Sequence, residues 1–209
     1  MIALTDAFAT LGIALAIYAG CVNLLYSRRN IRFEPHYLHA VLTLLVLFVL
    51  LAPARSSISL AAFVRGFSSD LSITFLALNV WSLCHRFGYV KPMDEREFDV
   101  LMATIAAAAL LLYPTALGWG DWDAYRAGWG SWWFLSALLV LCAVSMLLGL
   151  RVLPSLVAFA LLAWSAGVME SGNLWDYLLD PWLSVFALGF IFIKCPRRAY
   201  KFFIHRSSH

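Results

Sequence analysis

Long apolar stretches follow one another along nearly the whole chain, and short connections between them hold most of the charged residues. The 209 residues are 63% hydrophobic and 13% charged, whereas a soluble domain carries about 25% charged residues. One water-soluble core of this size cannot bury so much apolar surface, and lipid is the solvent that suits it. We therefore expect an all-α, polytopic integral membrane protein without a separate soluble domain.

The pattern predicts a bundle of about seven transmembrane helices, over residues 7–26, 36–52, 71–87, 100–117, 131–150, 152–168 and 174–193. The third stretch is apolar only as far as residue 84. We expect that helix to extend toward Tyr89 or to lie where the bilayer is thinned. The seventh contains Pro181, and residues 181–193 alone are too short to span, so we expect one helix kinked at the proline. A short surface helix that ends before Pro181 is the alternative.

The distribution of Lys and Arg predicts the orientation. If the loop at 27–36 is cytoplasmic, the alternation of helices places twelve of the fifteen basic residues inside and three outside. Because cytoplasmic loops are rich in Lys and Arg, we expect the N-terminus outside and the C-terminus inside. The domains are then a seven-helix transmembrane domain at 1–193 and a basic cytoplasmic tail at 194–209. Twelve Arg against three Lys is typical of a GC-rich bacterial genome, so the expected location is the bacterial inner (plasma) membrane.

Aromatic and acidic residues gather on the predicted outer face, in the loop GWGDWDAYRAGWGSWW at 118–133 and in MESGNLWDYLLDP at 169–181. Membrane-interface anchoring by tryptophan and helix capping by aspartate explain much of this composition. The alternative is a shallow outward pocket that binds a lipid headgroup, a sugar or a partner protein. Its candidate residues are Arg55, Arg65, Asp121, Trp122, Asp123, Arg126, Glu170, Asp176 and Asp180.

Two acidic pairs suggest chemistry. Asp121 and Asp123 have the DxD spacing that holds a divalent cation with a sugar nucleotide, but such nucleotides are cytoplasmic and this pair is predicted outside. We therefore expect no metal and no cofactor. Asp176 and Asp180 lie one helical turn apart, so they share a helix face and can divide acid and base roles; a cap and an interfacial acid is the alternative. The sequence contains no P-loop, GxSxG or HExxH motif.

The charged residues in the predicted spans and in the tail limit which functions the sequence allows. Ionisable residues are almost absent from the predicted spans, which argues against ion coupling. The tail KCPRRAYKFFIHRSSH mixes basic and aromatic residues, which favours an anionic membrane surface over nucleic acid.

Three hypotheses follow from the sequence. The first is a non-enzymatic component or accessory of an envelope-related membrane assembly, which binds lipid, a membrane protein partner or a second copy of itself through its outward loops. The second is a small lipid- or polysaccharide-modifying enzyme with an outward carboxylate site, which requires carboxylates that converge in a cleft. The third is a transporter of a small or hydrophobic solute, which requires a polar cavity that reaches the middle of the membrane. We prefer the first.

Overall fold

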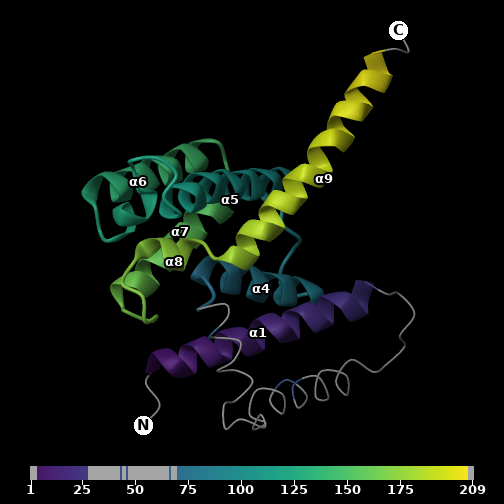
Figure 1. The fold of residues 1–209 in the computed structure, drawn as a ribbon. Coiled ribbons are helices and arrows are strands. Elements are labelled where there is room, and N and C mark those ends of the chain that lie inside the picture. The colour runs from purple at the N-terminus through teal and green to yellow at the C-terminus, as the bar shows by residue number, and fades with distance from the viewer. Residues whose placement is uncertain (1–3, 28–42, 44–45, 47–65, 67–69, 207–209) are drawn as a thin grey trace.

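The computed structural model describes residues 4–27, 43, 46, 66 and 70–206, and the regular structure in these residues is helical without a strand (Figure 1). The elements are α1 (Leu4–Ser27), α4 (Ile73–Arg86), α5 (Glu95–Ala116), the 3-10 helix η1 (Ala124–Gly128), α6 (Trp132–Leu147), α7 (Val152–Ser165), α8 (Leu174–Leu178) and α9 (Pro181–Arg206). The expected all-α class is confirmed for this part of the chain. Apart from residues 43 and 46, the span expected at 36–52 lies outside the described residues.

The helices pack as pairs around α7. Helix α5 lies along α9, α4 lies along α1, and α7 contacts α4, α5, α6 and α8 (Figure 1). Alanines allow the close approach: Ala106 and Ala109 of α5, Ala160 of α7 and Ala187 of α9 are each at most 5% exposed. The main apolar core therefore joins α5, α7, α8 and α9 and holds η1 against them.

Helix length separates two elements from the rest. Residues Thr5–Leu24 and Glu95–Ala116 are long and apolar enough to cross a membrane, whereas Trp132–Leu147, Val152–Ser165 and Pro181–Lys194 are shorter apolar helices. The 14 residues of α4 give a length of about 21 Å at 1.5 Å per residue. This helix ends at Arg86 and the chain turns at Gly88, which has a φ of 80°, so the expected extension toward Tyr89 is wrong.

The seventh apolar stretch forms two helices. Asn173 caps α8, Leu179 is extended with φ −143° and ψ 136°, and α9 begins at Pro181. The residue before a proline disfavours the helical region, and proline suits the first helical position, so the chain breaks here and restarts. The kinked helix expected over 174–193 is therefore wrong. Helix α9 instead continues to Arg206 and projects away from the other helices (Figure 1).

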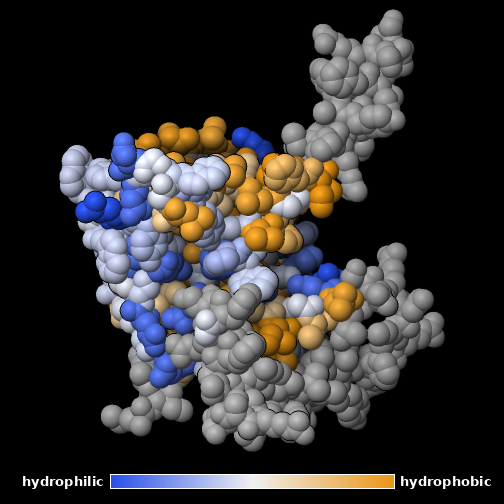
Figure 2. Space-filling model, viewed as in Figure 1, coloured by the Kyte–Doolittle hydropathy of each residue, from blue (hydrophilic) through white to orange (hydrophobic). Residues whose placement is uncertain are grey.

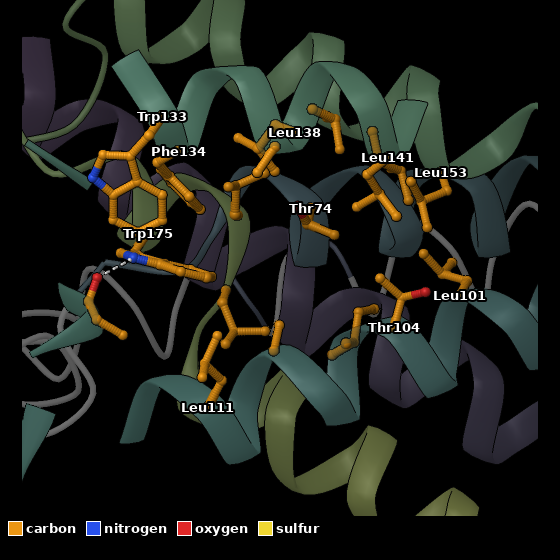
Figure 3. Close-up of a pocket in the computed structure, with 18 of the residues that line it drawn as sticks. Thr74, Leu101, Thr104, Leu111, Trp133, Phe134, Leu138, Leu141, Leu153 and Trp175 are labelled. Atoms are coloured by element: carbon orange, nitrogen blue, oxygen red, sulfur yellow. Dashed lines mark hydrogen bonds between the residues drawn. The ribbon is translucent and has the colours of Figure 1, made fainter. Parts of the chain in front are cut away.

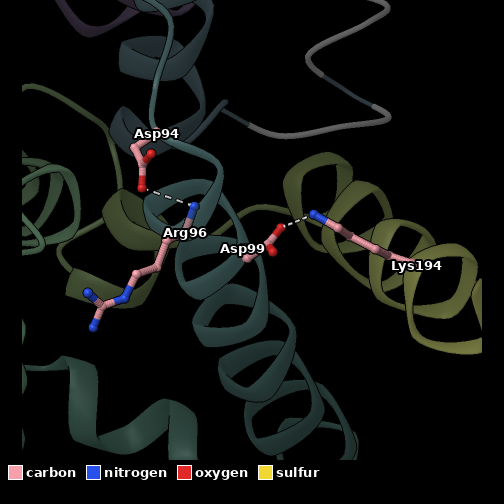
Figure 4. A network of polar contacts seen from close by, with 4 residues as sticks. All are labelled: Asp94, Arg96, Asp99 and Lys194. Carbon is pink, nitrogen blue, oxygen red and sulfur yellow. Dashed lines mark hydrogen bonds and ion pairs between the residues drawn. The ribbon is translucent and has the colours of Figure 1, made fainter. Parts of the chain in front are cut away.

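Polar contacts gather at the two ends of the bundle. One end holds η1, α8 and the start of α1, at the left of Figure 1. At the other end, Lys194 of α9 forms an ion pair with Asp99 of α5, close to the Asp94 cap of α5 (Figure 4). On the face shown in Figure 2, hydrophilic residues predominate toward the η1–α8 end, and most of the strongly apolar residues lie away from it.

Candidate functional site

The η1–α8 end is built around the buried amide of Asn173. Its Nδ2 donates to the Tyr125 carbonyl at 2.9 Å, and its Oδ1 accepts from the Trp175 backbone N–H at 3.0 Å. The indole of Trp175 donates to the Ala124 carbonyl at 2.9 Å. Side chains of α8 thus satisfy backbone carbonyls of η1, and the two short elements form one platform.

Gly128 is required where η1 approaches α8. A Cβ at this position would overlap Oδ1 of Asn173 and would lie 2.7 Å from Cδ1 of Trp175. Only a residue without a side chain fits this backbone approach. The sequence GWG at 128–130 therefore has a packing role that its aromatic composition alone does not reveal.

Asp176 is held by two hydroxyl groups. The Tyr125 hydroxyl donates to its Oδ2 at 2.9 Å, and the Ser171 hydroxyl donates to the same oxygen. Burial, the hydrogen bond to Asp176 and the negative charge of that carboxylate together raise the pKa of Tyr125 to about 12. The phenol is therefore neutral at pH 7 and donates its proton to Asp176 in this hydrogen bond.

Asp180 connects α4 to the start of α9. It is 3% exposed; its Oδ2 accepts from the Ser72 backbone N–H at 3.0 Å and from the Ser72 hydroxyl at 2.6 Å, while Oδ1 accepts from the Leu183 N–H at 2.8 Å. Asp180 and Asp176 line one cavity of about 240 Å³, which we call the acidic cavity. Its polar walls come from Asp70, Tyr113, Tyr125, Asp176 and Asp180.

The other predicted site residues are spread over the surface. Asp121 and Arg126 are exposed, and Asp123 caps η1 by accepting from the Tyr125 N–H at 2.9 Å. Glu170 is exposed in the connection between α7 and α8, and Arg55 and Arg65 lie outside the described residues. Of the nine candidates, the described structure brings only Asp176 and Asp180 into one cavity. No group of three His, Cys, Asp or Glu side chains in the described residues is arranged to hold a metal ion.

An apolar cavity of about 270 Å³ lies between α5, α6 and α7 (Figure 3). Trp133, Phe134 and Trp175 stand at its end near η1, and leucines line its opposite end (Figure 3). Phe134 and Trp175 have ring centroids 4.5 Å apart, so the aromatic end is closely packed. Thr104 also faces the cavity, and its hydroxyl donates to the Val100 carbonyl at 2.8 Å.

Trp122 is the one predicted site residue on this apolar wall; it lies 6.2 Å from Trp133 between ring centroids. The sequence did not single out the other wall residues as a site, because the preference of tryptophan for the membrane interface already explains the tryptophans among them. One signal was present in α5: the wall residues Leu101, Thr104, Ala108 and Leu111 recur every three or four residues and therefore share one helix face.

Comparison with known proteins finds no matching family model, no similar curated protein and no similar solved structure.

Proposed function

We propose that the chain is a multi-pass protein of the bacterial inner membrane, with the η1–α8 end outside and the α9 tail in the cytoplasm. In this proposal it is a non-enzymatic component of an envelope-related assembly that binds a membrane lipid. One acyl chain of the lipid occupies the apolar cavity between α5 and α6, and the headgroup lies beside the outer tryptophans. The observation that carries the proposal is this cavity with its aromatic outer end.

The exposed apolar surface supports membrane residence. Helix α6 contains no charged residue, yet Leu139, Met146 and Leu147 are 71%, 66% and 87% exposed. Phe159 of α7 and Val185 of α9 are also exposed, at 56% and 69%. Soluble monomers rarely expose so many large apolar side chains, and a helix that is apolar all round suits a lipid environment.

The walls of the apolar cavity support an acyl chain as its occupant. In a bilayer, a cleft with aliphatic walls that opens between two helices is filled by the surrounding hydrocarbon. Tryptophan prefers the depth where hydrocarbon meets headgroups, so Trp122, Trp133 and Trp175 indicate the outer end of the chain. A lipid of the outer leaflet therefore fits this cavity with its polar end at the η1 loop.

The hydrogen bonds of the acids favour a non-enzymatic role. Asp180 uses both carboxylate oxygens to accept from Ser72 and Leu183, and Asp176 accepts from Tyr125 and Ser171. A general base needs a carboxylate oxygen within reach of substrate. These two carboxylates instead join α4 to α9 and η1 to α8, so we rank the carboxylate enzyme second.

A photoactivatable phosphatidylglycerol with a diazirine in its acyl chain tests the lipid site. In reconstituted vesicles we expect crosslinks concentrated on cavity residues such as Leu141 and Leu156, mapped by mass spectrometry. Ala108→Phe fills the cavity and should reduce these crosslinks several-fold. Ala107→Phe is the matched control, because Ala107 is exposed and does not line the cavity. Crosslinks spread evenly over exposed α6 and α9, unchanged by Ala108→Phe, would contradict the proposal.

Purification in a mild detergent tests the assembly role. Mass spectrometry of the purified material should identify a protein partner in a fixed ratio to the chain, together with enriched lipid. A chain that carries lipid but no protein in a fixed ratio would overturn the assembly role and leave the lipid site to the crosslinking result.

A further inference from the structure

We propose that the apolar cavity is closed at its leucine end and therefore selects acyl chains by length, with space for about ten to twelve extended carbons. This inference rests on the lipid site proposed above and specifies which chains that site holds. Three features of the cavity support it: the exposure of its walls, the contacts beyond its end and its length.

The cavity opens near η1 and not at the leucine end. Its exposed lining residues are Leu111, Trp122, Trp133 and Ala137, and none of them lies at the leucine end. There, Leu101 of α5 and Leu153 of α7 are only 3% and 5% exposed. Figure 3 shows these two leucines at the end opposite to Trp133. An acyl chain therefore enters beside the tryptophans, and its terminal methyl group points toward the leucines.

Contacts just beyond the leucine end cover it. Glu97 of α5, one helical turn before Leu101, accepts a hydrogen bond from the backbone N–H of Arg151. Arg151 lies in the connection between α6 and α7, two residues before Leu153, and Leu150 in the same connection is buried. The α6–α7 connection is thus held against the first turns of α5, and it leaves no path for a chain to continue past the leucines.

The length of the cavity limits how many carbons fit. On α5 the lining residues run from Leu111 to Leu101, about 15 Å of helix, and on α6 from Trp133 to Leu141, about 12 Å. An extended hydrocarbon chain advances about 1.25 Å for each carbon, because C–C bonds of about 1.5 Å meet at about 111°. The cavity therefore holds about ten to twelve carbons between the tryptophans and the leucines.

Packing provides the selection, because the cavity and the surrounding bilayer are both apolar. A shorter chain leaves a void beside Leu101 and Leu153, and side chains that line a void lose dispersion contacts. A longer chain cannot pass the leucines, so it must fold within the cavity or move its headgroup away from η1. Overfilling a closed apolar space is also unfavourable. A chain of matching length fills the cavity and keeps its headgroup beside Trp133.

Competition between phosphatidylglycerols that differ only in chain length tests the selection. The full chain is reconstituted in vesicles with a diazirine-bearing dilauroyl phosphatidylglycerol. Unlabelled dioctanoyl, dilauroyl or dipalmitoyl phosphatidylglycerol is then added at equal mole fraction in the membrane. We expect the dilauroyl lipid to reduce crosslinks on Leu141 and Leu156 several-fold more than either of the other two lipids does.

Two substitutions at the closed end should shift the preferred length in opposite directions. Leu153→Ala deepens the cavity, so dipalmitoyl phosphatidylglycerol should become the better competitor. Thr104→Leu adds bulk to the wall near the same end, so dioctanoyl phosphatidylglycerol should gain, and this variant keeps the test informative if Leu153→Ala does not fold. Leu139→Ala is the control, because Leu139 is exposed and does not line the cavity. A general loss of stability would not produce opposite shifts.

The outcomes distinguish length selection from lipid binding itself. If no chain length gives crosslinks concentrated in the cavity, the lipid site is wrong, and length selection fails with it. If the cavity is crosslinked but the three competitors act equally, the lipid site stands and length selection is overturned. The same holds if Leu153→Ala and Thr104→Leu both fold and keep the wild-type preference.

Discussion

The carboxylate of Asp180 accepts hydrogen bonds from both the backbone N–H and the hydroxyl of Ser72, 108 residues earlier in the chain. The same carboxylate caps the first turn of α9 through the Leu183 N–H. Asp180→Ala leaves these buried donors without an acceptor, at a cost of about 1–3 kcal/mol for each. The melting temperature in detergent, followed by circular dichroism, should fall by roughly 5 °C or more.

Asp121→Ala is the matched control for this prediction. Asp121 is exposed, and substitution of an exposed residue away from such contacts changes stability by less than about 0.5 kcal/mol. Equal melting temperatures for Asp180→Ala and Asp121→Ala would show that the Ser72 contact does not hold α4 to α9.

Hydropathy located the apolar middle of most helices but not their polar ends. The fourth stretch was expected to start at residue 100, yet α5 begins at Glu95, because Asp94 caps it and Glu95 and Glu97 suit the positive end of the helix dipole. Similarly, α9 continues past the apolar boundary at 193 to Arg206. The polar turns at the ends of these helices have low hydropathy. A search for apolar stretches therefore assigns them to the connections between helices.

The acidic pair at 176 and 180 shows why the candidate site was only partly predictable. The one-turn spacing suggested a shared helix face, but α8 ends at Leu178 and the extended Leu179 separates the two residues. They still line one cavity because α8 and α9 meet there. The partners that hold them, Ser72 and Tyr125, come from distant parts of the chain, and local spacing contains no information about such contacts.

Gly128→Ala should strongly destabilise the η1–α8 platform. The added Cβ would overlap the Asn173 amide, which already bridges Tyr125 and Trp175 by hydrogen bonds, so the backbone of η1 must move. Overpacking of this kind costs about 1–3 kcal/mol or more. Gly189→Ala on α9 is the control: a Cβ there meets no atom within 4 Å, and alanine is the better helix former. A melting temperature for Gly128→Ala that matches or exceeds that of Gly189→Ala would contradict the packing described for η1.

The Tyr125 phenol should titrate well above an ordinary tyrosine, whose pKa is about 10. Burial and the contact with Asp176 raise the pKa of Tyr125 to about 12, so folding favours the neutral phenol. Its contribution to stability is therefore fully present below about pH 10 and is lost as the pH rises toward 12. Ultraviolet absorbance of the wild type minus that of Tyr125→Phe should show one phenol that ionises near this higher value. Asp176→Asn should lower that midpoint only in part, because burial is the larger cause of the raised pKa. In the wild type, a Tyr125 midpoint equal to the pKa of an ordinary tyrosine would be inconsistent with this contact.

The orientation of the bundle predicts which introduced thiols a membrane-impermeant maleimide reaches in intact cells. The experiment uses a chain in which serine replaces each native cysteine, at positions 21, 84, 142 and 195. A thiol at Asp121, exposed in the loop before η1, should be labelled from outside. A thiol at Arg151, exposed between α6 and α7 at the opposite end, should react only after the membrane is permeabilised, because basic connections face the cytoplasm. The reverse pattern would place the tryptophan-rich end and the acidic cavity inside the cell, and the lipid would then belong to the inner leaflet.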